Sequence, residues 1–243
     1  MGESIWQSME RRGYSRREFL QFCAAAATAA GLGQSGVAQV EAAFESREKI
    51  AVLWLHFHEC GCCSESFTRA LHPVVADALL DLKSLTYAQT LMAVSGSQEG
   101  ESLTELIGEQ MGTYIVLVEG AVPSHLIAKG AEAVLQTVAA GAAAIMAWGS
   151  CASNGKVQAA GGDLIGATPI EKLVDKPVIK VSGCPPVGDV MMHVATHLLV
   201  LGAIPPVESI GRSREFYGRR MHSSPLPQPC AAENSESAAI SVV

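Results

Sequence analysis

Short apolar runs alternate with stretches of helical spacing along most of the chain. The apolar runs predict strands at Ala51–Phe57, Ser84–Met92, Tyr114–Val118, Ala142–Trp148 and Pro177–Val181. Apolar positions three and four residues apart predict helices at Ser64–Leu80, Ser102–Gln110, Pro123–Ala139 and Pro185–Leu201, and a helical turn at Pro169–Val174. Continuous apolar strands between helices are typical of a parallel sheet that is covered on both faces. We therefore expect an α/β fold with a doubly wound, flavodoxin-like sheet.

The N-terminal segment has a different pattern, which is typical of an export signal. Arginines in Ser15-Arg16-Arg17-Glu18-Phe19-Leu20 precede a short apolar run at 22–32, as in a twin-arginine signal. A membrane span needs about 20 apolar residues, so this run is too short to be one. We expect a signal at 1–43 and a periplasmic protein, peripheral at most to the inner membrane. The alternative is an ordinary Ala-rich helix after a chance Arg-Arg pair.

The C-terminal part also departs from the alternating pattern. Pro205-Pro206 interrupts it, and the following residues are basic and poor in core-forming side chains. From Ser223 the chain is rich in Pro, Ala and Ser, which predicts disorder. We therefore expect the folded α/β domain to span 48–204 and a short irregular tail to occupy 205–243.

Composition narrows the classes of function. Hydrophobic residues make up 49% of the 243 residues and charged residues 17%, with a formal net charge of −7. An acidic chain of this kind is not a typical nucleic-acid binder, which usually has a basic face. The apolar content predicts a well-buried core and a surface partly covered by a protein partner.

Cysteines carry the candidate chemistry. There are seven, so they cannot all form pairs within the chain. Cys60 and Cys63 follow the first predicted strand, Cys151 follows the fourth and Cys184 the fifth. In a parallel sheet these positions share the carboxyl edge, where open α/β folds bind their ligands. Helices that begin nearby should lower the thiol pKa values and stabilise thiolates.

Four thiolates suit either a [4Fe–4S] cluster or a structural zinc ion. Zinc sites in ribbons and knuckles usually have two Cys-x-x-Cys pairs on tight turns. Here one such pair is followed by two isolated cysteines far along the chain. Glycines at 149 and 183 would let the backbone approach a bulky inorganic core. This dispersed set favours the iron–sulfur cluster.

At this point a family resemblance is visible. The motifs that carry it are Trp54-Leu-His56, Glu59-Cys60-x-Cys62-Cys63-Ser-Glu-Ser-Phe67, Leu91-Met-Ala, Val118-Glu119-Gly, Trp148-Gly-Ser-Cys151-Ala-Ser, Val157-Gln-Ala-Ala, Ala167-Thr-Pro and Gly183-Cys184-Pro-Pro. Together they resemble the small subunit of nickel–iron hydrogenases, especially the membrane-associated uptake type that the twin-arginine route exports. The resemblance covers roughly 49–222.

The resemblance implies an electron-transfer subunit of an oxidoreductase. It implies a proximal [4Fe–4S] cluster on Cys60, Cys63, Cys151 and Cys184, with Glu119 close to it. The cluster would take electrons from hydrogen oxidation at the nickel–iron site of a separate large subunit, so no catalytic residue is expected in this chain. A membrane cytochrome b is a further partner that the family implies.

Departures from the family pattern concern the residues around and beyond that cluster. Cys62 stands where oxygen-tolerant members have an extra cysteine, but Lys156 replaces their second one, so the modified cluster of those members is not expected. Lys156 could instead lie beside the cluster as a cation. His222 matches the distal-cluster histidine, yet Pro225 replaces the next cysteine and Cys230 matches no ligand. We therefore expect one cluster, without the medial and distal ones.

Two other functions remain open at this stage. The cluster-bearing subunit of complex I shares this fold, a tandem Cys-Cys and the Gly-Cys-Pro-Pro motif. A second alternative is a non-catalytic remnant that binds the large subunit but passes no electrons onward.

Overall fold

The computed structural model describes residues 4–30, 32–46, 50–70, 84–88, 103–105, 107–123, 129–155, 159–160 and 166–218. Within these residues a five-stranded sheet has the order β2-β1-β3-β5-β7. Its strands are β1 (Ala51–His56), β2 (Ser84–Ala88), β3 (Ile115–Glu119), β5 (Ala144–Trp148) and β7 (Val178–Val181). Every neighbouring pair is parallel. The flavodoxin-like doubly wound sheet is thus confirmed.

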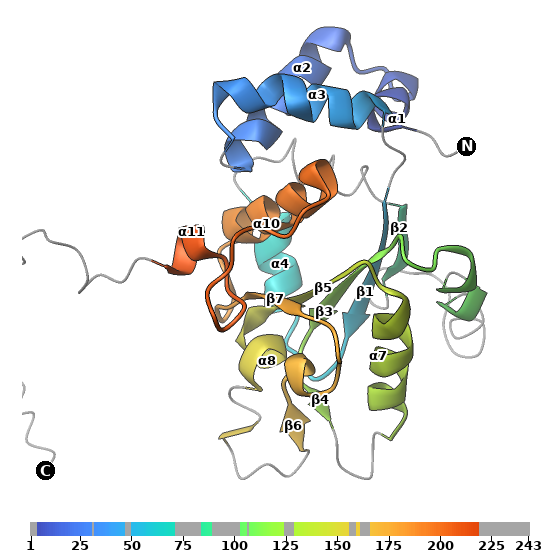
Figure 1. Ribbon diagram of the computed structural model, residues 1–243, viewed down its shortest axis with the longest axis vertical. Helices are drawn as coiled ribbons and strands as arrows, with labels where there is room; N and C mark the ends of the chain where they lie inside the picture. Colours follow the sequence, from blue (N-terminus) through green and yellow to red (C-terminus); the bar gives the residue numbers. More distant parts are fainter. Residues whose placement is uncertain are drawn as a thin grey trace, which may run out of the picture.

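The two faces of the sheet bury different residues. Along β1, Val52 and Trp54 join one core cluster, while Leu53 and Leu55 join the other. This alternation follows from the two-residue period of a strand. Helix α7 (Lys129–Gly141) covers one face through Leu135, and α4 (Cys62–Thr68) and α10 (Gly188–Leu201) lie on the other (Figure 1).

The N-terminal segment packs as a helical layer outside α10 (Figure 1). It contains α1 (Ile5–Arg11), α2 (Arg16–Ala29), η1 (Gln34–Gly36) and α3 (Val37–Ser46). A capping box between Ser15 and Glu18 begins α2, and its Ala-rich sequence favours the helix. Arg16 forms ion pairs with Glu41 and Glu45 of α3. The apolar face of α2 is buried, namely Phe19, Phe22, Cys23, Ala26 and Ala27.

No helix among the described residues combines the length and the apolar character that a membrane crossing requires.

Arg16 also lies over two aromatic rings of the N-terminal layer, 5.2 Å from the Trp6 centroid and 5.0 Å from that of Phe19. The segment that the sequence predicts to be an export signal therefore packs against the folded domain in this structure.

Residues 205–218 lie along the free edge of β7. The amide of Lys180 donates to the carbonyl of Gly211 at 2.8 Å, and a parallel bridge joins Lys180 to Arg212. The short helix α11 (Arg214–Tyr217) follows. The part of the expected irregular tail that the structure describes is thus attached to the sheet.

Two predicted helix starts are wrong. Pro123 ends a short strand, β4 (Val122–Pro123), which pairs with β6 (Ala167–Thr168). Helix α10 begins at Gly188 rather than at Pro185, after Val187 as its N-cap in an extended conformation. Both prolines lie in segments whose backbone bonds to distant parts of the chain, which a local pattern does not reveal.

Several other predicted elements are shorter than expected or only partly described. The turn at Pro169–Val174 contains the 3₁₀ helix η3 (Ile170–Lys172). Helix α8 (Gly149–Asn154) was not predicted. The continuous helix predicted at Ser64–Leu80 is wrong, because α4 ends at Thr68 with Arg69 as its C-cap. The expected end of the strand at Ser84–Met92 lies outside the described residues, as do residues 71–80 and part of the helix at Ser102–Gln110.

Candidate metal centre

The candidate centre lies where β1, β3, β5 and β7 end. Strand β2 lies on one side of β1 and β3 lies on the other, so the chain changes direction between β1 and β3. Crevices at such a switch point, beyond the carboxyl ends of the strands, are the usual ligand sites of open α/β sheets. Cys60, Glu119, Cys151 and Cys184 all follow or end strands at this edge.

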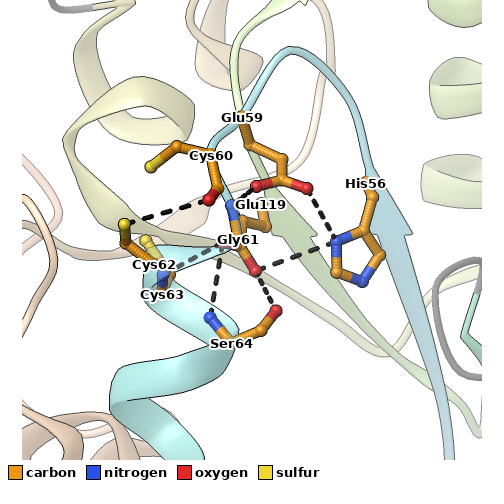
Figure 2. Close-up of polar contacts among 8 residues, drawn as sticks. All are labelled: His56, Glu59, Cys60, Gly61, Cys62, Cys63, Ser64 and Glu119. Atoms are coloured by element: carbon orange, nitrogen blue, oxygen red, sulfur yellow. Dashed lines mark hydrogen bonds and ion pairs between the residues drawn. The ribbon is translucent and has the colours of Figure 1, made fainter.

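A tight turn after β1 presents the first cysteines. Gly61 has a left-handed conformation with φ 73° and ψ −5°, which glycine adopts without steric cost. The turn is also fixed by Glu59, whose carboxylate accepts from the Gly61 amide. Helix α4 then begins at Cys62, so Cys62 and Cys63 lie in its first turn (Figure 2).

Glu119, at the end of β3, fixes this first turn from the neighbouring strand. Its carboxylate accepts from the amides of Cys63 at 3.1 Å and Ser64 at 3.3 Å, and from the Ser64 hydroxyl (Figure 2). The side chain is 1% exposed. A buried carboxylate at this position satisfies amides that the helix leaves without intrahelical partners.

His56 lies beside both carboxylates. Its Nδ1 is 3.7 Å from Glu59 Oε1 and 3.8 Å from Glu119 Oε2. Burial lowers the pKa of His56, and the negative charge of Glu119 opposes this effect. Burial and the Glu119 charge together raise the pKa of Glu59. The acidic and basic groups of this corner therefore influence one another.

The loops that carry Cys151 and Cys184 are joined directly. Ser150 donates its amide to the Gly183 carbonyl at 2.7 Å, and its hydroxyl accepts from the Gly183 amide at 3.2 Å. Gly149 has φ 87°, and a Cβ there would lie 2.5 Å from the Cys63 sulfur. Only glycine therefore lets the Cys151 loop approach Cys63 so closely.

Five cysteines lie near one another at this carboxyl edge of the sheet, which we call the rim: Cys60, Cys62, Cys63, Cys151 and Cys184. Cys60 and Cys151 lie close enough to Cys63 to raise its pKa, and Cys60 and Cys184 lie close enough to Cys62 to raise its pKa. Cys60 and Cys184 are exposed, and the other three are half-buried. The predicted ligands thus lie on one rim, and Cys62 lies among them.

The expectation that helix N-termini lower the thiol pKa values is wrong for two cysteines. Burial raises the pKa of Cys63, and the negative charge of Glu119 raises it further. A hydrogen bond with Cys60 raises the pKa of Cys62. Removal from water and nearby negative charge therefore outweigh the dipole of the short α4. Such thiols need a compensating positive charge to ionise, and metal ions supply one.

The donor set can be compared with two kinds of metal group. Within the described residues, no three His, Cys, Asp or Glu side chains lie close enough to share one metal ion. A structural zinc ion needs four such ligands, at about 2.3 Å for sulfur. An iron–sulfur cluster takes cysteine thiolates on separate irons, so its ligands surround a larger core. The dispersed thiols and the close Gly149 backbone fit the cluster better.

An aromatic layer lies directly beneath the rim. The ring centroids of Trp54 and Trp148 are 4.9 Å apart in an edge-to-face arrangement, and Phe67 of α4 lies 4.8 Å from Trp148. The ring of His56 stacks on Trp54 at 5.3 Å. Trp54, Trp148 and Phe67 are buried, and Cys63 packs against the core cluster that they belong to, so these rings form an aromatic floor of the site.

Some predicted residues lie elsewhere or outside the described part. Lys156, His222 and Cys230 are outside the described residues. Cys23 is buried in α2 of the N-terminal layer, where burial raises its pKa to about 12. Sequence reasoning missed Ser150 as a link between loops and His56 as a neighbour of two carboxylates. The only local signal for Ser150 is a hydroxyl next to a cysteine.

Comparisons with known proteins agree with this architecture. Residues 60–198 match the family model described as NADH ubiquinone oxidoreductase, 20 Kd subunit. The chain is 44% identical over 228 residues to the Hydrogenase-1 small chain of Escherichia coli K12, covering 90% of this chain and 61% of that one. It is 44% identical over 237 residues to the uptake hydrogenase small subunit of Cupriavidus necator H16, covering 94% and 66%.

A solved structure shows the same likeness. The Ni-Fe-Se hydrogenase from Desulfomicrobium baculatum, in a reduced, active form, superposes with a TM-score of 0.65 and 28% identity over 72% of this chain and 73% of that chain. The chain spans about three fifths to two thirds of the length of the curated relatives named above. The predicted resemblance is confirmed: the chain belongs to the family of the NADH ubiquinone oxidoreductase 20 Kd subunit, and within it to the relatives of hydrogenase small subunits.

Proposed function

We propose that this chain is the electron-transfer subunit of a nickel–iron hydrogenase and holds a [4Fe–4S] cluster on Cys60, Cys63, Cys151 and Cys184. The observation that carries the proposal is the convergence of these cysteines from the ends of three parallel strands onto one rim. The relatives named as hydrogenase small subunits support the same function.

The chain's own residues would hold and surround this group. Glu119 fixes Cys63 through its amide, and Gly149 leaves room beside the Cys63 sulfur. When bound, the cluster supplies single-electron uptake and release. The four cysteines would ionise to bind it, and the buried aromatic floor would keep water away from its inner side.

The exposed side of the rim is the proposed docking side for a large catalytic subunit. Cys60 and Cys184 are exposed there, so a partner that covers them would bring its own redox centre close to the cluster. An acidic chain whose redox group lies at the surface suits exchange of electrons with a docked protein. The nickel–iron site belongs to that partner.

We also propose export by the twin-arginine route. The motif at Ser15–Leu20 supports it, and the route carries folded proteins. The expected result is that Arg16→Lys combined with Arg17→Lys leaves the protein in the cytoplasmic fraction, while Arg11→Lys with Arg12→Lys does not. Equal periplasmic amounts of both variants would contradict export by this motif.

A second candidate function is a cluster-bearing subunit of a quinone-linked complex. The observation that favours it is the description of the matching family model. The relatives at 44% identity favour the hydrogenase. Co-purification from the native host separates the two, because the first function requires a hydrogenase large subunit and the second requires quinone reductase components.

The functional test is hydrogen-dependent dye reduction by the complex with a hydrogenase large subunit. The expected result is that the complex with the intact chain reduces a viologen dye under hydrogen, and that Cys63→Ser lowers the rate at least tenfold. The matched control is Cys23→Ser, which changes a cysteine in the N-terminal layer and should leave the rate unchanged.

Two outcomes would count against the proposal. A complex that forms but shows no hydrogen-dependent reduction would assign the chain to a remnant that binds without passing electrons. A rate that is equal in Cys63→Ser and in the unchanged chain would show that the rim cysteines are not on the electron path.

A further inference from the structure

The geometry points to a hydroxyl clamp around the Cys184 loop, formed by Ser66, Ser150 and Tyr217, in which Tyr217 acts as a positioning residue. The inference rests on the proposed function for what the loop would hold, namely one ligand of the cluster. The clamp itself is a property of the protein and can be measured in the iron-free chain.

Ser150 holds the loop from the Cys151 side. Its two bonds to Gly183 join residues that directly precede Cys151 and Cys184. The loop has no spare room here, because a Cβ on Gly183 would lie 2.4 Å from the Pro186 Cα. Since Ser150 is buried, water does not readily replace these bonds.

Ser66 holds the loop from the Cys63 side. Its hydroxyl donates to the Pro186 carbonyl at 2.6 Å, two residues after Cys184. The close packing of this segment on α4 is also seen at Gly188, where a Cβ would lie 2.3 Å from the Ser66 carbonyl oxygen. Helix α4 therefore carries Cys63 and, through Ser66, also holds the segment that follows Cys184.

Tyr217 completes the clamp from the far end of the chain. Its hydroxyl donates to the Ser182 carbonyl at 2.7 Å, two residues before Cys184. Burial raises the pKa of Tyr217, so the hydroxyl keeps its proton for this bond at physiological pH. The guanidinium of Arg212 lies 5.2 Å from the ring centroid and holds the ring in place.

Residues 205–218 thereby gain a role that their sequence does not indicate. They carry few core residues, yet they bring Tyr217 to the backbone beside a predicted ligand. The three hydroxyls bond to the backbone of Ser182, Gly183 and Pro186, so the loop is held on both sides of Cys184. A loop held in this way keeps its cysteine near the position that a cluster requires.

The test compares Tyr217→Phe with the unchanged full-length chain. The variant keeps the ring and removes only the hydroxyl. Loss of one hydrogen bond, about 1 kcal/mol, corresponds to about fivefold faster amide hydrogen exchange. We expect that increase at 182–184 in the iron-free protein. In the reconstituted protein we expect a chelator to remove iron about fivefold faster.

The matched control is Tyr114→Phe, because the Tyr114 hydroxyl also donates to a carbonyl, that of Val138 at 2.6 Å, but away from the rim. This variant should leave exchange at 182–184 unchanged. Ser66→Ala should change the loop in the same direction as Tyr217→Phe, which guards against a misfolded single variant.

Unchanged exchange at 182–184 in both Tyr217→Phe and Ser66→Ala would overturn the clamp. A protein that binds no iron but shows the faster exchange would refute the proposed function and leave the clamp standing. If the protein binds iron but exchange at 182–184 in both clamp variants equals that of Tyr114→Phe, the clamp would be refuted and the proposed function would stand.

Discussion

Glu119 connects the end of β3 to the helix that carries Cys62 and Cys63. Its carboxylate is almost fully buried and accepts hydrogen bonds from two amides and a hydroxyl. A buried charge is tolerated only when hydrogen bonds replace its hydration. The buried Glu119 carboxylate is therefore stable only while these donors remain in place.

Glu119→Gln should lower the stability of the iron-free chain. The amide NH₂ of Gln would face donors that now meet a carboxylate oxygen, and hydrogen bonds to a charged group are worth about 2 kcal/mol. We expect a loss of about 2 kcal/mol in the free energy of unfolding, measured with urea. The exposed Glu109→Gln is the control, and equal stabilities of the two variants would refute this role.

His56 should make the stability sensitive to mild acid. Burial lowers its pKa in the folded chain, below the value of about 6.5 in the unfolded chain. Between these values the unfolded chain binds more protons, so stability is complete above about pH 6.5 and is lost as the pH falls through the folded pKa. Urea midpoints at pH 7.5 and 5.5 measure this loss.

His56→Gln should show a smaller fall between the two pH values than the unchanged chain, whatever its stability at pH 7.5. The exposed His58→Gln should keep the full fall. If all three proteins lose the same amount, the acid sensitivity originates elsewhere.

At the scale of elements, α2 is the test of the N-terminal layer. Phe22 is buried and stacks on Phe44 of α3, with ring centroids 5.3 Å apart. Phe22→Ala should cost about 3–5 kcal/mol if this layer is part of the folded unit. Leu20→Ala, on the exposed side of the same helix, should cost much less. Equal small effects on thermal unfolding would show that the layer does not stabilise the chain.

The elements of the α/β domain could be predicted because their signals are local. Continuous apolar runs such as 144–148 are buried on both faces, as strands of a parallel sheet must be. The starts at Pro123 and Pro185 could not be predicted. Pro123 pairs with Ala167, and the Pro186 carbonyl accepts from Ser66, so in both cases the deciding partner is distant in sequence.

At the scale of the whole molecule, parallel strand direction explains why the rim could be predicted. Cysteines that follow parallel strands reach the same edge wherever they lie in the sequence. The side chains that orient them could not be predicted in this way, since Ser66 and Tyr217 bond to carbonyls far along the chain. The sequence therefore locates the candidate ligands but not the contacts that position them.

The most direct test of the central claim is the iron and sulfide content of the anaerobically reconstituted full-length chain, together with its electron paramagnetic resonance spectrum after reduction. We predict about four iron and four sulfide per chain and the signal of a reduced [4Fe–4S] cluster. Cys184→Ser should lose most of the iron and Cys23→Ser should retain it. Stoichiometric zinc without sulfide, or equal iron in both variants, would contradict the account.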